Sequence, residues 1–198
     1  MKIIGITGGV GAGKSAILAF FEREYNACIL QADLIAHELQ MPGKACYAEI
    51  IKVFGSSVLT AEGLIDRKTL GNIVFQDKEK LQQLNQIVHP AVKKAIIEKI
   101  ATIEQQGIYS LVVLEAALLI EDHYDMICDE LWYIDTKDNI RRERLKHTRG
   151  YSDDKIDRMF LSQLSREEFL KACQVVIDNS GTLEETYRQI REEYQCQR

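Results

Sequence analysis

Five short apolar runs recur along the chain, separated by stretches in which apolar residues return every three or four positions. The runs cover residues 2–7, 27–31, 109–114, 130–135 and 175–177. Continuous apolar runs of this length are typical of strands that are buried on both faces. Because the stretches between them have helical periodicity, the pattern predicts an α/β fold with a five-stranded parallel sheet flanked by helices.

A complete phosphate-binding loop follows the first predicted strand. In its sequence pattern, backbone N–H groups wrap phosphates, a lysine reaches their oxygens and a hydroxyl binds Mg²⁺. A helical stretch comes next, so the positive end of that helix faces the phosphates. The loop predicts a site for ATP and Mg²⁺, with Lys14 as a catalytic charge clamp and Ser15 as a metal ligand. Its nucleotide-binding residues are Gly8, Gly9, Val10, Gly11, Ala12, Gly13, Lys14 and Ser15.

Acidic residues stand at the ends of two other predicted strands. Asp33 ends the second strand, in Gln31-Ala32-Asp33, where its carboxylate could take a proton from an acceptor hydroxyl, which favours phosphoryl transfer over hydrolysis. The alternative is that Asp33 caps the helix that starts at Leu34. Glu115 follows the third strand and is a candidate for the Mg²⁺ shell, and Glu121 is an alternative for the same role.

The segment between the second and third predicted strands is much longer than a single crossover helix requires. Pro42 and Gly43 break its helical pattern, and Asp66 fits an N-cap for the helix that follows. We therefore expect residues 33–108 to form a helical insertion that binds the acceptor substrate. The remaining core is expected over residues 1–32, 109–137 and 173–198.

A long amphipathic stretch within this insertion covers residues 78–103. We expect one interruption, at His89 and Pro90, because proline suits the first turn of a new helix. The His89 side chain has two open interpretations, contact with a substrate phosphate or a packing and capping role.

A second helical excursion, over residues 138–172, follows the fourth predicted strand. Basic residues crowd its first helix, which should end near Gly150, and a helical pair should follow from Asp153 to Phe169. Next to a nucleotide site, this concentration of cations suggests a lid that closes over the transferring phosphate. The alternative is a solvated helix face with pairs such as Arg142 and Glu143. The basic residues are Arg141, Arg142, Arg144, Lys146, His147 and Arg149.

Composition restricts the partners and the compartment. The 198 residues are 46% hydrophobic and carry a formal net charge of −5, without a basic tail or stripe, so we expect no nucleic-acid partner. No apolar run is long enough to cross a bilayer, so we expect no membrane partner. Five scattered cysteines without metal-ligand spacing indicate reduced thiols in the cytoplasm, with no disulfide and no structural zinc.

Together these motifs resemble the dephospho-coenzyme A kinase family. The phosphate loop would be shared with many kinases, whereas Asp33, the Asp66-Arg67 pair and His89-Pro90 are much more specific. Further matching segments are Phe54-Gly55, Val74-Phe75, Ala117-Leu118-Leu119-Ile120-Glu121, Gln163 and Ile177-Asp178-Asn179-Ser180-Gly181.

The resemblance implies a P-loop kinase in which ATP phosphorylates the ribose 3′-hydroxyl of dephospho-CoA, the last step of CoA biosynthesis. By this similarity Asp33 is the general base, while Arg67 and His89 belong to the acceptor side. Arg144 is implied as a catalytic lid arginine near the ATP phosphates, and Asn179 as part of the loop beside the adenine. We expect an enzyme whose partner is a small-molecule substrate, dephospho-CoA, and which is a monomer or a weak homo-oligomer.

The chain departs from the usual family pattern mainly in the lid. Arg141 replaces a frequent Gln, and Thr148 occupies the usual position of a second lid arginine. Ala117 stands where proline is common, and Cys173-Gln174 replaces a common Ala-Asp pair. The alternative functions are a nucleoside or nucleotide monophosphate kinase and a non-catalytic nucleotide sensor. A GTPase is disfavoured because the chain lacks the base-reading Asn-Lys-x-Asp motif.

Overall fold

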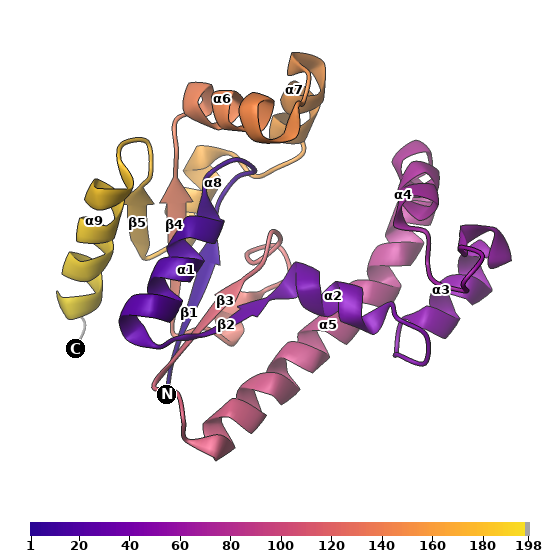
Figure 1. The fold of residues 1–198 in the computed structure, drawn as a ribbon, viewed down its shortest axis with the longest axis horizontal. Helices are drawn as coiled ribbons and strands as arrows, with labels where there is room; N and C mark the ends of the chain where they lie inside the picture. The colour runs from indigo at the N-terminus through magenta and orange to yellow at the C-terminus, as the bar shows by residue number, and fades with distance from the viewer. Residues whose placement is uncertain (197–198) are drawn as a thin grey trace. The chain divides into compact units, whose positions relative to one another are not determined.

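A computed structural model describes residues 1–196 of the chain and contains a five-stranded parallel sheet (Figure 1). The strand order is β2-β3-β1-β4-β5, so β1, which leads into the phosphate loop, is the central strand. The sequence prediction of five parallel strands is confirmed. The strands are β1 (Lys2–Thr7), β2 (Cys28–Gln31), β3 (Leu111–Glu115), β4 (Glu130–Asp135) and β5 (Val175–Asp178).

The chain divides into two compact units. The first contains Met1–Leu30 and Gln106–Arg198, and the second is the continuous segment Gln31–Gln105. Helices of the first unit are α1 (Lys14–Tyr25), α6 (Asp138–Arg149), α7 (Asp153–Leu161), α8 (Arg166–Ala172) and α9 (Leu183–Cys196). Those of the second are α2 (Ala32–Leu39), α3 (Tyr47–Phe54), α4 (Arg67–Gln76) and α5 (Lys78–Gln106). Short 3₁₀ turns lie at Ser56–Val58 and Tyr124–Met126.

The core of the first unit lies between the sheet and helices α1 and α9. Ile4 and Ile6 of β1 are fully buried against Phe20 and Phe21 of α1. The Phe21 ring meets Trp132 of β4 edge-on, with ring centroids 5.6 Å apart. Burial of aromatic rings of this size is a main stabilising contribution to such a core, and it fixes the start of α1 at the end of β1.

The other face of β4 is covered by α8. The Tyr133 ring stacks on Phe169 with centroids 4.7 Å apart, and its hydroxyl donates to Asp135. Burial, with a smaller contribution from the neighbouring Asp135 charge, raises the pKa of Tyr133, so the phenol stays protonated and keeps this donor. Arg166 binds the same carboxylate, with its Nη2 2.7 Å from Asp135 Oδ2. These contacts anchor α8 to the carboxyl end of β4.

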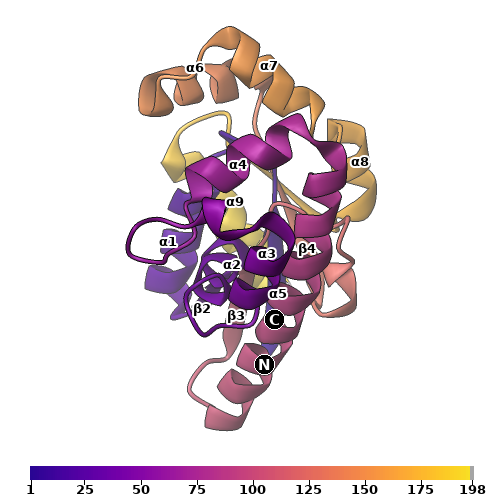
Figure 2. The same ribbon diagram turned by 90° about the vertical axis from the view of Figure 1, so that its right-hand side faces the viewer.

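Helices α6 and α7 lie side by side beyond the carboxyl ends of the strands of this unit (Figures 1 and 2). Arg142 of α6 binds both Asp153 and Asp157 of α7, and its Nη1 lies 2.8 Å from Asp153 Oδ1. The pairing of Arg142 with Glu143 that the alternative interpretation expected is therefore wrong, because the carboxylates of α7 are the partners. The predicted helical pair after residue 153 is confirmed as α7 and α8.

The second unit is helical and has its own small core. Cys46, Ile50, Phe54, Val58 and Leu70 are buried together, and apolar residues of α4 and α5 pack around them. The break predicted at Pro42 and Gly43 is confirmed, since α2 ends at Leu39 and α3 starts at Tyr47.

The predicted interruption at His89 and Pro90 is wrong, because α5 runs without a break from Lys78 to Gln106. Proline removes one hydrogen-bond donor from a helix and strains the preceding turn. Residues on both sides of Pro90 pack on the same core, however, among them Ile87, Val88 and Ala91. Tertiary packing on both sides therefore outweighs the local preference of proline for a helix start.

Two further predictions concern the limits of the strands. Strand β3 begins at Leu111 and includes Glu115, so Tyr109 and Ser110 lie outside it and Glu115 is its last residue rather than the residue after it.

Among the described helices, none is long and apolar enough to cross a membrane. All five cysteines are free thiols.

Asp66 caps α4, as the sequence predicted. One carboxylate oxygen accepts from the backbone N–H groups of Lys68 and Thr69 at 3.0 and 3.2 Å, and the other accepts from the Thr69 hydroxyl at 2.6 Å. The Thr69 hydroxyl is the largest cause that lowers the pKa of Asp66. A carboxyl with a lowered pKa in the folded state stabilises the fold above its ordinary pKa and loses this effect as the pH falls through the lowered value.

We expect Asp66→Ala to lower the free energy of unfolding by about 1 kcal/mol at neutral pH, because α4 loses its N-cap. Urea unfolding measures this difference. Glu104→Ala, an exposed substitution in the same unit, is the control and should leave stability nearly unchanged. Equal stability of the two variants at neutral pH would contradict the capping role.

Candidate active site

Lys14, the first residue of α1, holds its ammonium group over the phosphate loop. Its Nζ donates to the Gly8 carbonyl oxygen at 2.8 Å and lies 3.5 Å from Glu115 Oε1. Glu115 reaches this position because β3 pairs with β1 in a register that sets Glu115 opposite Ile6. Both side chains are largely buried, with 16% and 12% exposure. The cation is therefore held beside the loop by a carbonyl and a carboxylate.

The other two predicted metal ligands have different surroundings. Ser15, the second residue of α1, is exposed, and its hydroxyl makes no hydrogen bond to residues 1–196. Glu121 lies on an exposed turn after β3. The structure thus brings Glu115 next to Lys14 and the loop. Among the described contacts, none joins Glu121 to Lys14 or to the loop.

The Ala12 carbonyl of the loop is the acceptor for three side chains from distant parts of the sequence. Asn179 Nδ2 donates to it at 2.6 Å, Thr136 Oγ1 at 3.1 Å and Arg144 Nη1 at 3.2 Å. Arg144 Nη2 also donates to the Asn179 carbonyl at 2.9 Å. The structure therefore brings Arg144 of α6 and Asn179 of the loop after β5 together at the phosphate loop.

Gly13 occupies a position that requires glycine. Its φ is +86°, and a Cβ atom there would lie 2.5 Å from Asn179 Nδ2. Asn179 is itself fully packed, at 1% exposure, and its Oδ1 accepts from the Thr186 hydroxyl at 2.9 Å. Glycine thus permits both the left-handed backbone and the close approach of the Asn179 amide.

Asp33 lies in the second unit, and its local structure differs from the prediction. Helix α2 begins at Ala32, so Asp33 sits in the first helical turn instead of ending a strand. The alternative role as N-cap is also wrong, since Gln31 occupies the N-cap position and no side chain caps this helix. The Asp33 carboxylate is exposed and bonds to no other group within residues 1–196. An acid in the first turn is favoured there by the helix dipole.

The other two candidate acceptor-side residues share this unit. Arg67 is the exposed first residue of α4, placed there by the Asp66 cap. His89 is partly buried within the continuous helix α5 and has an interaction partner. Asp33, Arg67 and His89 therefore belong to one unit, and the groups that surround the phosphate loop belong to the other.

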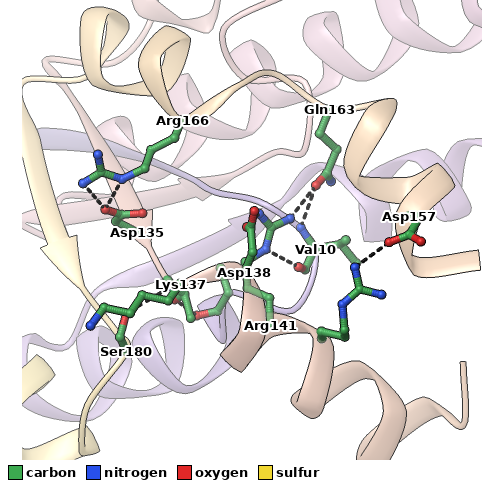
Figure 3. Close-up of polar contacts among 12 residues, drawn as sticks. Val10, Asp135, Lys137, Asp138, Arg141, Asp157, Gln163, Arg166 and Ser180 are labelled. Atoms are coloured by element: carbon green, nitrogen blue, oxygen red, sulfur yellow. Dashed lines mark hydrogen bonds and ion pairs between the residues drawn. The ribbon is translucent and has the colours of Figure 1, made fainter. Parts of the chain in front are cut away.

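Sequence reasoning assigned no individual role to three residues that contact the loop. Thr136 follows β4 directly, a position at the carboxyl edge of the sheet that could have drawn attention to its hydroxyl. Arg141 appeared as a member of a basic cluster and as a departure from the family pattern, and Gln163 appeared only as a match to the family. Both bind the backbone of Val10 (Figure 3).

Comparisons with known proteins agree with this geometry. The family model described as Dephospho-CoA kinase matches residues 2–185. The chain is 40% identical over 190 residues to the dephospho-CoA kinase of Carboxydothermus hydrogenoformans, and the match covers 96% of this chain and 91% of that protein. It is also 40% identical over 195 residues to the enzyme of Aquifex aeolicus, with 98% and 97% coverage.

Solved structures give the same result for the fold. A dephospho-CoA kinase from Campylobacter jejuni superimposes with a TM-score of 0.71 at 25% identity, covering 98% of this chain and 96% of that one. The protein TT1252 from Thermus thermophilus gives a TM-score of 0.85 at 27% identity, with 99% and 97% coverage. Shikimate kinase from Acinetobacter baumannii shares the fold alone, with a TM-score of 0.57 at 12% identity and coverage of 100% and 95%.

The predicted P-loop kinase fold and the resemblance inferred from the motifs are thus confirmed. The match over residues 2–185, together with 40% identity to relatives over nearly the whole chain, leads to one conclusion. This chain belongs to the dephospho-CoA kinase family.

Proposed function

We propose that this chain transfers the terminal phosphoryl group of ATP to the ribose 3′-hydroxyl of dephospho-CoA through the residues described above. Family membership makes the chain a kinase that phosphorylates dephospho-CoA with ATP in CoA biosynthesis. The observation that carries the assignment of roles is the phosphate loop with Lys14 held over it, 2.8 Å from the Gly8 carbonyl. A lysine in this position serves as the charge clamp on the phosphates.

On the nucleotide side, Lys14 would exchange its contacts with Gly8 and Glu115 for phosphate oxygens. Arg144 would stabilise the charge that develops on the transferring group, since its guanidinium already lies at the loop. Asn179 would form part of the adenine side of the site, which its packing against Ala12 and Thr186 supports. We assign the lid role to residues 138–172, the segment of α6, α7 and α8.

On the acceptor side, Asp33 would be the general base. Its exposed carboxylate is available to accept the proton of the 3′-hydroxyl while the new bond forms from that oxygen to the γ-phosphorus. The bond from phosphorus to the β–γ bridging oxygen then breaks, and ADP leaves. Arg67 and His89 would bind the acceptor, and we assign residues 33–108 as the acceptor-binding insertion.

The residues present fit a magnesium ion that is bound mainly by the nucleotide. Residues 1–196 contain no cluster of three or more His, Cys, Asp or Glu side chains able to hold a metal. Magnesium commonly takes only one or two protein ligands and completes its shell with phosphate oxygens and water. The exposed Ser15 hydroxyl would be one ligand, and Glu115 is the better placed of the two carboxylates. When bound, the ion would neutralise phosphate charge.

Two further sequence predictions remain proposals. We propose that the protein is cytoplasmic, since all five cysteines are free thiols. We also propose a monomer or weak homo-oligomer that needs neither nucleic acid nor a membrane.

We expect purified protein with Mg-ATP to phosphorylate dephospho-CoA in preference to other acceptors. A panel of dephospho-CoA, nucleoside monophosphates and nucleosides, followed by ADP release and by mass analysis of the product, measures this preference. The product should carry its new phosphate on the ribose 3′-oxygen. Robust turnover of a nucleoside monophosphate without turnover of dephospho-CoA would identify a nucleotide kinase, and ATP binding without product from any acceptor would identify a nucleotide sensor.

A further inference from the structure

Two side chains hold the peptide groups on both sides of Val10 in the phosphate loop (Figure 3). The Val10 backbone N–H donates to Gln163 Oε1 at 3.1 Å. The Val10 carbonyl accepts from Arg141 Nε at 2.9 Å. The ring of contacts closes because Arg141 Nη2 donates to the same Gln163 oxygen at 2.9 Å. Donor and acceptor of Val10 are thus both bound by the lid segment.

Arg141 is itself fixed from several sides. Its guanidinium lies over the Phe160 ring, 4.1 Å from the centroid, and its Nη1 lies 3.0 Å from Asp138 Oδ1. Only 13% of its side chain is exposed. A Cβ atom on Gly9 would lie 2.2 Å from Arg141 Nη2, so the guanidinium rests directly on the backbone of the loop. Arg141 can approach this closely because residue 9 is glycine.

We infer that Arg141 and Gln163 are positioning residues for ATP: they hold the Val10 backbone so that the phosphate loop keeps its binding conformation before the nucleotide arrives. A loop with glycine at positions 8, 9, 11 and 13 has many conformations open to it when unrestrained. Ordering such a loop at the moment of binding would subtract from ATP affinity, whereas a loop that is already ordered avoids this loss. This inference rests on the proposed use of the loop to bind ATP.

A different role for Arg141 would be direct binding of a phosphate. The geometry disfavours it, because the Nε, Nη1 and Nη2 groups already donate to Val10, Asp138 and Gln163. The two roles differ in what they require. A phosphate ligand needs only positive charge, which lysine retains, whereas the contact with Val10 and Gln163 needs the planar guanidinium with its separate N–H groups.

Four variants test the inference by calorimetric measurement of the Kd for Mg-ATP and by kcat at saturating ATP. We expect Arg141→Lys and Gln163→Leu each to raise the Kd for ATP about ten-fold, the effect of losing hydrogen bonds to a charged group, and to leave kcat nearly unchanged. The double variant should bind ATP about as weakly as either single variant, since both substitutions disrupt the same set of hydrogen bonds at Val10. Gln163→Glu keeps an oxygen acceptor for both donors and should recover most of the affinity lost in Gln163→Leu.

Arg191→Lys is the matched control, because Arg191 of α9 is another carboxylate-bound arginine of the same unit, with its Nε 3.1 Å from Glu24 Oε1 of α1, and it lies outside both the lid segment and the phosphate loop. It should bind ATP as the unmodified protein does, and thermal unfolding of each variant checks that it is folded. Wild-type ATP affinity in Arg141→Lys or in Gln163→Leu, or additive losses in the double variant, would overturn the inference. If the unmodified protein itself binds no ATP, the proposed function fails, and not merely this inference.

Discussion

Asp33→Asn should lower kcat for phosphorylation of dephospho-CoA by roughly 10²–10⁴-fold, the usual contribution of a general base. The substitution keeps the size of the side chain and removes the group that accepts the proton. ATP affinity should remain nearly intact, because Asp33 belongs to the second unit, Gln31–Gln105, and the phosphate loop belongs to the first. Single-turnover kinetics with saturating substrates, together with calorimetry for ATP, measure the two effects separately.

Asp77→Asn provides a matched control for this experiment. Asp77 lies in the same unit and accepts from the backbone N–H groups of Glu79 and Lys80 at the start of α5. Asparagine caps a helix about as well as aspartate, so the same chemical change should leave kcat unaffected there. Normal turnover in Asp33→Asn, or a loss confined to ATP binding, would show that Asp33 is not the base.

Lys14→Ala should reduce both ATP affinity and turnover, with kcat/KM falling by roughly 10²–10³-fold, the cost of removing one preorganised group that stabilises transition-state charge. Lys14 would bind phosphate oxygens in the ground state and in the transition state, so both constants should respond. Calorimetry with Mg-ATP and steady-state kinetics measure them.

The substitution also removes the ammonium group beside the Glu115 carboxylate, which is 12% exposed. Removal of one member of a largely buried ion pair destabilises proteins, so a fold defect must be separated from loss of a phosphate contact. The double variant Lys14→Met with Glu115→Gln removes both charges and should fold well yet still bind ATP weakly. Lys2→Ala removes a partly buried ion pair with Glu130 in the same unit and should leave ATP binding intact. Unchanged kinetics in Lys14→Ala would contradict any role of this loop in phosphate binding.

Much of the fold could be predicted from local pattern alone. Each of the five strands is a short apolar run, and the Asp66 cap follows from one residue and its position before a helix. The continuous α5 could not be predicted in this way, because packing on both sides of Pro90 outweighs the local effect of proline. The start of α2 at Ala32 was missed for a different reason. No side chain caps this helix, so no capping residue marks where it begins.

The phosphate loop, the strand before it and the family could all be inferred from the sequence, because each depends on short motifs whose residues are neighbours in the chain. The surroundings of the loop depend on the tertiary structure. Thr136, Arg144 and Asn179 meet on the Ala12 carbonyl across sequence separations of 124 to 167 residues. Arg141 and Gln163 likewise reach Val10 across 131 and 153 residues. Hydrogen bonds of this kind form only when packed helices and strands bring distant backbone and side-chain atoms to within about 3 Å of each other. The local periodicity of the sequence does not predict these distances.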